Sequence, residues 1–298
     1  MINYPLAACL MIVQAFLFAA EPAIIHKVGL HASTEQLVLL RGIGGIAVVA
    51  LLARQTGWRV FRTKQFPLQI VRGLVSAFFF AIMMYTYPRL PFADATCLFY
   101  TQVVYIAIFS AVLLGEKVTP WKWGAALLSV VGAALILKPA FESWSAVYLL
   151  AMLGAALNGA AFVLNKYLQR PGGDSDLTTM LYINIVLTVC AAPMVATNDF
   201  VIPDAWLWMI AASLVAGPVG TYLSIVAIRF APASALGPFT ALRLVAALLA
   251  SVVLFREPMA DTSAIGAIVV LVSCLMSTVI PAAGFRRPAI FLRALRQS

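Results

Sequence analysis

Charged residues are scarce in this sequence: 10% of its 298 residues are Asp, Glu, Lys or Arg, against about 25% in a typical soluble protein. Hydrophobic residues make up 63%, which is more than a water-soluble fold of this size can bury. A P-loop, an HExxH motif, a GxSxG motif and a paired His/Cys cluster are also absent. These absences argue against an enzyme and against a bound cofactor or metal.

Two further absences concern targeting and redox chemistry. No Lys or Arg precedes the first apolar stretch, and Glu21-Pro22 interrupts the small residues that a signal-peptide cleavage site needs. We therefore expect the first stretch to remain as a membrane span. The cysteines lie in apolar stretches without metal-ligand spacing, which predicts small packing residues: Cys9, Cys97, Cys190 and Cys274.

Long apolar runs fill most of the chain. Crossing a hydrocarbon core of roughly 30 Å takes about 20 apolar residues of helix, and backbone groups in lipid must be satisfied within the segment. The sequence therefore predicts an all-α membrane protein with ten transmembrane helices. The expected spans are 5–25, 34–53, 67–87, 93–114, 121–138, 145–167, 176–196, 205–228, 232–254 and 264–281.

The net charge of +9 is explained by topology. If the N-terminus is cytoplasmic, thirteen Lys and Arg residues fall in the inside loops and the tail, and four fall outside: Lys27, Arg89, Lys138 and Arg256. This asymmetry follows the positive-inside rule and places both termini in the cytoplasm, in a cell inner membrane. No nucleic-acid partner is needed. The basic tail, 282–298, is either a short helix on anionic lipid or a frayed end.

The two halves of the chain share a pattern. Gln102 precedes Glu116 by fourteen residues, and Arg243 precedes Glu257 by the same distance, at an offset of 141. A lysine near the end of each half's first span matches at an offset of 139. Because each copy holds five spans, an odd number, the second copy enters the membrane inverted. We expect repeats at 1–139 and 140–281, with the tail outside both.

At this point the sequence resembles the EamA-type carriers of the drug/metabolite transporter superfamily, and within them the S-adenosylmethionine-uptake-like branch. The resemblance implies two five-helix repeats around a central cavity and proton- or exchange-driven transport of small metabolites, without ATP hydrolysis. It rests on LRG (40–42), IVRG (70–73), the stretch 87–139 that contains LLGE and LKP, and its second-half counterpart at 231–258.

Ionisable residues inside spans cost about 2.5–3.5 kcal/mol each at the helix centre and usually face a partner or a site. Arg243 is the leading candidate to bind the negative part of a substrate, and a salt bridge to Glu21 is the alternative. Glu21 is a candidate proton-coupling group or an ordinary acid at the interface. Arg41 is a second substrate candidate, whereas Arg72 is expected to anchor its helix at the cytoplasmic headgroups.

Aromatic and amide side chains on spans three, four and six suggest a pocket for an organic molecule, although such stripes are more often packing. The substrate-binding candidates of this kind are Gln102, Tyr105, Phe79, Asn158 and Tyr100. Glu116 and Glu257, at the ends of equivalent spans, are expected to be gate or end-cap residues.

These features predict a secondary active transporter of a small organic metabolite, working by alternating access. A net positive site favours a carboxylate-bearing compound such as an amino acid or an S-adenosylmethionine-like molecule. The alternatives are a lipid-modifying membrane enzyme and a small-solute channel. The expected partners are the substrate, the lipid bilayer and, as a candidate coupling ion, the proton; a monomer and a homodimer both remain open.

Overall fold

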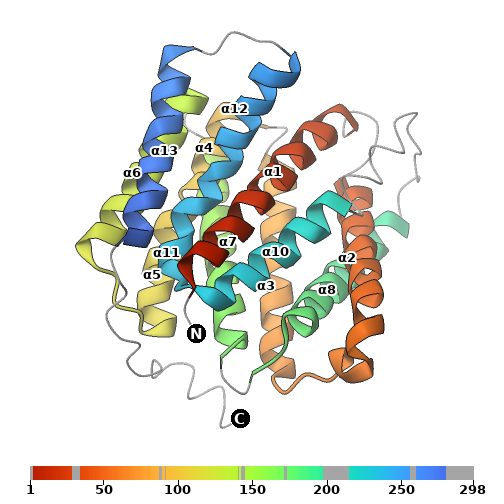
Figure 1. The fold of residues 1–298 in the computed structure, drawn as a ribbon. Helices are drawn as coiled ribbons and strands as arrows, with labels where there is room; N and C mark the ends of the chain where they lie inside the picture. Colours follow the sequence, from red (N-terminus) through yellow and green to blue (C-terminus); the bar gives the residue numbers. More distant parts are fainter. Residues whose placement is uncertain are drawn as a thin grey trace.

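The fold is a bundle of helices (Figure 1). The part of the chain that the computed structural model describes contains helices, turns and loops and no β-strand. The described residues are 3–28, 34–86, 89–90, 92–139, 141, 145–170, 173–196, 215–255 and 260–279.

The helices follow the expected order in both halves. The first half contains α1 (Tyr4–Val28), α2 (Thr34–Thr56), the short 3₁₀ helix η1 (Trp58–Phe61), α3 (Phe66–Thr86), α4 (Phe92–Tyr100), α5 (Gln102–Leu114) and α6 (Pro120–Leu137). The second half contains α7 (Ala146–Leu168), α8 (Asp176–Ala196), α10 (Gly217–Phe230), α11 (Ala233–Leu236), the 3₁₀ helix η3 (Gly237–Ala241), α12 (Leu242–Phe255) and α13 (Asp261–Val279).

In the described part of the chain, five helical stretches are long and apolar enough to cross a membrane: Phe66–Met83, Asp94–Leu114, Pro120–Leu137, Ala146–Leu168 and Asp176–Val195. Shorter apolar helical stretches cover Tyr4–Ala19, Ala233–Leu249 and Asp261–Ser277. The all-helical membrane prediction is thus confirmed in its coarse form. Large apolar side chains point outward along these helices, as lipid-facing residues do; among them are Phe78, Val112, Leu149, Val189 and Leu275. Cys97 and Cys274 are buried as expected, but the expectation of a core position is wrong for Cys9 and Cys190, which are exposed on the outward faces of their helices.

Two of the expected spans are interrupted. The span predicted at 93–114 divides at Thr101 into α4 and α5. The span predicted at 232–254 divides at the 3₁₀ turn η3, because the Gly-Pro pair at its start favours a tight turn over a continuous α-helix. Each interruption lies just before a residue of the shared pattern, Gln102 in α5 and Arg243 in α12.

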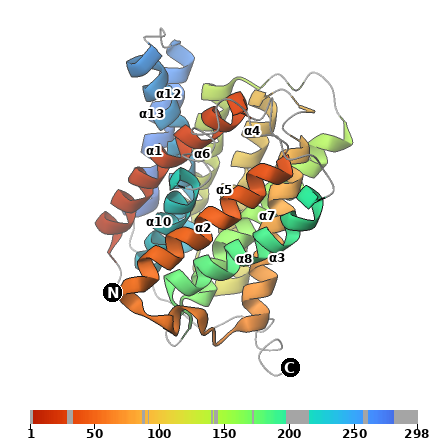
Figure 2. The ribbon, with the colours of Figure 1, turned by 90° about the vertical axis from the view of Figure 1, so that its right-hand side faces the viewer.

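Helices of the first half pack mainly against helices of the second. The most extensive pairs are α6 with α13 and α2 with α8. These two pairs lie at opposite edges of the bundle in Figure 1, and Figure 2 shows α2 and α8 side by side at the front. Between the two pairs, α1 packs on α10 and α12, and α3 packs on α7 and α8. The core of the molecule is therefore an interface between its two halves.

Glycine allows the closest of these approaches. A Cβ built on Gly132 of α6 would lie 2.9 Å from the carbonyl oxygen of Gly266, and one built on Gly266 of α13 would lie 2.8 Å from that of Gly132. Any side chain at either position would push the backbones apart. Such small-residue contacts are how helices associate within lipid, where apolar burial provides little driving force.

Candidate functional site

Arg41 of α2 lies among aromatic rings from two other helices. Its guanidinium carbon is 4.9 Å from the ring centre of Phe80 on α3 and 5.8 Å from that of Phe18 on α1. Its Nη2 also donates to Thr221 Oγ1 on α10 at 3.2 Å. Because aromatic faces stabilise a cation without neutralising it, the positive charge is preserved inside the bundle.

Arg243 comes from the other half and has a similar environment. It lies in the first turn of α12, half-buried, directly after η3. Its Nε donates to the hydroxyl of Tyr100 at 2.5 Å, and its guanidinium carbon is 4.7 Å from that ring. Within the described ranges no carboxylate pairs with Arg243. Arg41 and Arg243 are close enough for their charges to repel each other.

We call Arg41, Arg243, Phe18, Phe80 and Tyr100 the arginine cluster. It brings two guanidinium groups from opposite halves together, each backed by aromatic rings. Two adjacent like charges destabilise one another unless an anion lies between them. Arginine favours the planar, bidentate recognition of carboxylate and phosphate, so the side chains of the arginine cluster are of the kind that bind such groups in proteins.

Three further candidates meet at the interface of α5 and α7. Asn158 Nδ2 donates to Gln102 Oε1, so these amides already bond to each other. A Cβ on Gly159 would lie 2.9 Å from Tyr105 Cβ, which shows how closely α7 approaches α5 there. Tyr105 stacks on Phe109 with ring centres 6.4 Å apart. These contacts join the two halves beside the arginine cluster.

The Phe79 ring packs in the core against other aromatic rings. It lies 5.0 Å from the ring of Phe80 and 5.9 Å from that of Phe99, and it is 9% exposed. The aromatic residue of α3 that contacts Arg41 is Phe80, which the sequence reasoning passed over, as it did Thr221. The signal was present in the run of three phenylalanines, 78–80, but a run cannot say which ring points inward.

Arg72 does not serve as a headgroup anchor, contrary to expectation. It is 6% exposed, donates from Nε to Asn165 Oδ1 of α7 at 2.8 Å, and also donates to Ser76 Oγ. The inward face of α3 carries it into the interface between the halves, out of reach of lipid headgroups. The backbone of Glu21 lies in α1, but its side chain is not among the parts that the structure describes. Glu257 lies outside the described residues.

Glu116 joins the halves at the end of the bundle where α5, α7 and α10 finish, which we call the basic end. Its two carboxylate oxygens accept the backbone N–H groups of Ala233 and Ser234 at 3.0 and 3.1 Å, and one also accepts the Ser234 hydroxyl at 2.6 Å. Lys122 Nζ donates to the same hydroxyl at 2.9 Å. Glu116, which is 8% exposed, therefore caps the N-terminus of α11 in the other half.

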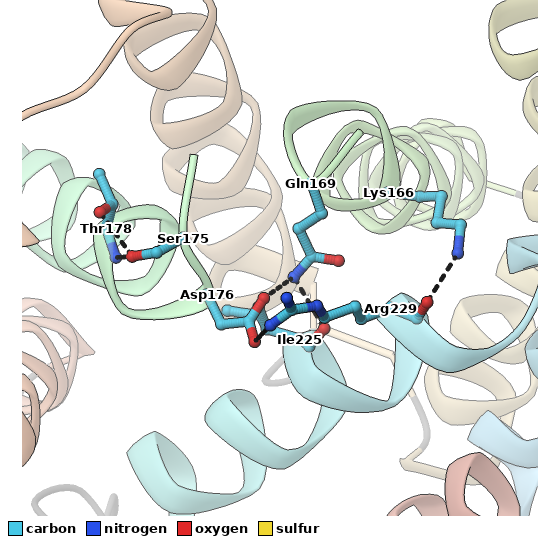
Figure 3. A network of polar contacts seen from close by, with 7 residues as sticks. All are labelled: Lys166, Gln169, Ser175, Asp176, Thr178, Ile225 and Arg229. Carbon is cyan, nitrogen blue, oxygen red and sulfur yellow. Dashed lines mark hydrogen bonds and ion pairs between the residues drawn. The ribbon is translucent and has the colours of Figure 1, made fainter. Parts of the chain in front are cut away.

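Lys166 reaches from α7 to the end of α10, where it donates to the carbonyls of Ile228 and Ala231. Figure 3 shows its longer hydrogen bond to the carbonyl of Arg229, at 3.5 Å. A cation at the C-terminal end of a helix complements the helix dipole. Beside it, Asp176 accepts from Gln169 at 2.9 Å and pairs with Arg229 at 3.3 Å. Figure 3 thus shows α7, α8 and α10 of the second half fastened together at the basic end.

A second cross-half contact at the basic end involves Asp174, in the loop between α7 and α8. Its carboxylate accepts from the Thr63 hydroxyl at 2.5 Å, from the Lys64 backbone N–H at 2.8 Å and from the Gln69 amide at 2.9 Å. Together with Glu116, this contact connects the two halves at the basic end.

Comparison with known proteins agrees with this two-half architecture. The model of the EamA-like transporter family matches the chain twice, over residues 5–138 and 145–279. This chain belongs to the EamA-like transporter family. A crystal structure of a protein with 19% sequence identity superposes with a TM-score of 0.79, covering 93% of this chain and 98% of the other, and shows the same fold.

EamA-like relatives with assigned names transport different molecules. The pseudopaline exporter of Pseudomonas aeruginosa is 28% identical over 65% of this chain and 67% of its own. The riboflavin transporter of Brucella anthropi is 28% identical over 67% and 71%, and the S-adenosylmethionine uptake transporter of Rickettsia bellii is 23% identical over 74% and 75%. The family and the transport class are therefore clear, while the relatives do not single out one substrate.

Proposed function

We propose that this protein is a secondary active transporter of a small organic metabolite that bears a carboxylate or phosphate group. The arginine cluster carries the proposal, because it contains two guanidinium groups from opposite halves whose charges act on each other, each lying against aromatic rings. The guanidinium groups would hold the anionic group, and Phe18, Phe80 and Tyr100 suit the organic part of the molecule. Pseudopaline, riboflavin and S-adenosylmethionine, named for its relatives, are the first molecules to test.

An inverted pair of five-helix repeats is the architecture we propose for this carrier. Matching the halves in order pairs α1 with α7, α3 with α10 and α5 with α12. Under this exchange the contact of α1 with α10 becomes that of α7 with α3, and the contact of α1 with α12 becomes that of α7 with α5; all four contacts occur. This correspondence supports a two-fold relation between the halves, as inverted repeats require.

Alternating access then follows from relative movement of the halves about the arginine cluster. Glu116 and Asp174 connect the halves at the basic end, and we propose that Glu116 acts as a gate residue there. The positive-inside rule makes the basic end cytoplasmic, with both termini on that side of the inner membrane. In this assignment the structure has its cytoplasmic end closed, and Glu21 remains our candidate for proton coupling.

A thermal-shift screen of the purified carrier tests the proposal. A true ligand stabilises the folded protein by mass action, so one anionic metabolite should raise the melting temperature in a concentration-dependent way. Arg243→Gln should then abolish the shift. Arg89→Gln is the matched control, because Arg89 stacks on Tyr85 at 3.7 Å in the same way but is exposed. Full stabilisation of Arg243→Gln by the same ligand would remove the arginine cluster from the site.

A further inference from the structure

Arg72 is a buried cation that has no counter-charge within the described part of the chain. It is 6% exposed, and its hydrogen bonds go to two neutral side chains, Asn165 and Ser76. Among the described residues no carboxylate pairs with it. A neutral side chain would suffice to hold α3 against α7, and a buried charge carries a desolvation cost that a neutral group avoids. The charge itself therefore calls for an explanation.

The position of Arg72 relates it to the arginine cluster. Arg72, Ser76 and Phe80 follow one another at intervals of four residues, so they lie on one face of α3. Phe80 carries Arg41 on its ring. Eight residues of helix span about 12 Å, which places Arg72 roughly that far from Phe80, on the side of the basic end. One turn further on, Gln69 bonds to Asp174, which closes that end.

The facing helix, α7, has polar groups at the same two levels. Asn158 bonds to Gln102 beside the arginine cluster, and Asn165, two turns later, bonds to Arg72. Both asparagines lie on one face of α7, since seven residues make nearly two turns. Polar side chains from both halves thus form a row between α3, α5 and α7 that leads from the arginine cluster to the basic end.

We propose that Arg72 is a second anion-binding station, which pairs with the carboxylate or phosphate of the transported molecule as it moves between the arginine cluster and the cytoplasm. The inference rests on the proposed transport function. In the closed state Asn165 and Ser76 hold the guanidinium in place. When the halves separate at the basic end, the charge faces the opening and attracts the anionic group.

Thiol labelling tests this station without knowledge of the substrate. The four native cysteines are replaced by alanine, and Ser76→Cys places a thiol beside Arg72. Inside-out vesicles expose the cytoplasmic face to anionic sulfonatoethyl methanethiosulfonate or to its cationic trimethylammonioethyl counterpart. We expect the anionic reagent to react about tenfold or more faster than the cationic one, after correction for their rates with a free thiol, because the reagent charge meets an unscreened guanidinium. A corrected ratio at or below one would overturn the station.

Variants of Arg72 identify the source of the preference. Arg72→Gln should remove it and Arg72→Lys should retain it, whereas Arg229→Gln, at an exposed arginine of the basic end, should leave the ratio unchanged. A preference that survives Arg72→Gln contradicts the assignment. If Arg72→Gln does not fold, the proposal is still tested by the corrected ratio of the two labelling rates, measured in the Ser76→Cys protein and in its Arg72→Lys variant.

A second reporter, Ser110→Cys on α5, separates the station from the transport function. Ser110 is buried one turn before the end of α5, and its carbonyl accepts the backbone N–H of Glu116. Labelling of Ser110→Cys but not of Ser76→Cys would mean that the basic end opens without reaching Arg72, which refutes the station alone. If neither Ser76→Cys nor Ser110→Cys is labelled, the basic end does not open. That result refutes both alternating access and the anion-binding role of Arg72. An anionic preference at Ser76→Cys in a protein that moves no solute would refute transport alone.

Discussion

Replacing Glu116 by Gln should weaken the closed basic end more than any other single polar change there. The carboxylate accepts three hydrogen bonds from the first residues of α11, at 2.6, 3.0 and 3.1 Å. An amide keeps one acceptor oxygen but turns its NH₂ toward the donors of Ser234. One buried backbone N–H then loses its acceptor, and the negative charge near Lys122 and Lys166 disappears.

The size of the effect follows from these contacts. A hydrogen bond to a charged group contributes about 1.5–3 kcal/mol, and breaking one partner of a buried charged pair costs roughly 3–5 kcal/mol. Taking about 3 kcal/mol, the closed state loses roughly a hundredfold in population relative to the open state. Ser234→Ala removes only a hydroxyl that Glu116 and Lys122 share and leaves both backbone hydrogen bonds of Glu116 in place, so it should cost about 1.5 kcal/mol, the lower end of the range for a hydrogen bond to a charged group.

Pulsed electron–electron resonance can measure this shift between spin labels at Lys64 and Arg229, exposed positions in opposite halves at the basic end. A longer distance component should grow in the order wild type, Ser234→Ala, Glu116→Gln. Glu35→Gln, in the first turn of α2, is the matched control and should resemble the wild type. Identical distance distributions in wild type and Glu116→Gln, with both proteins folded, would refute the reasoning.

Three further predictions concern packing and binding. Gln14→Leu should match or exceed wild-type thermal stability, because Gln14 Oε1 is buried without a hydrogen-bond partner in the described structure, a loss of about 1–3 kcal/mol; a clear fall in melting temperature would contradict this. Gly266→Leu should destabilise the carrier by about 1–3 kcal/mol through overpacking against α6, whereas Gly124→Ala, with its nearest neighbour at 3.7 Å, should not. Tyr100→Phe should weaken binding of the ligand found by thermal shift less than tenfold, since the ring under Arg243 remains; a loss as large as that of Arg243→Gln in equilibrium binding would show that the hydroxyl dominates.

The sequence predicts the helical membrane fold because apolar run length alone decides it. The break before Arg243 was also predictable, since Gly237-Pro238 disfavours a continuous helix. Which aromatic side chain contacts which arginine could not be predicted from the sequence. Phe78, Phe79 and Phe80 are adjacent and point about 100° apart, so one is exposed, one is in the core and one contacts Arg41.

Arg72 shows the same limit in another form. Five residues from the start of an apolar span, an arginine is within snorkelling distance of the headgroups. Only the rotation of α3 about its own axis, set by packing against α7 and α8, decides whether the side chain points to lipid or to the interior. The mean hydropathy of the span carries no information about that rotation. The signal was the helical spacing of Gln69, Arg72 and Ser76, which places these polar side chains on one side of α3.

Only a short segment of chain separates Ser234, the hydrogen-bond partner of Glu116, from Arg243. Ser234, which Glu116 holds, precedes Arg243 by nine residues, all within α11, η3 and the first turn of α12. Because this segment is short and helical, a displacement of Ser234 also displaces Arg243. By linkage, any free energy with which an anion at Arg243 strengthens or weakens the Glu116 contact must equal the change that this contact makes in anion affinity. The change in ligand affinity caused by Glu116→Gln would therefore equal the free energy with which a ligand bound at Arg243 strengthens or weakens the Glu116 contact.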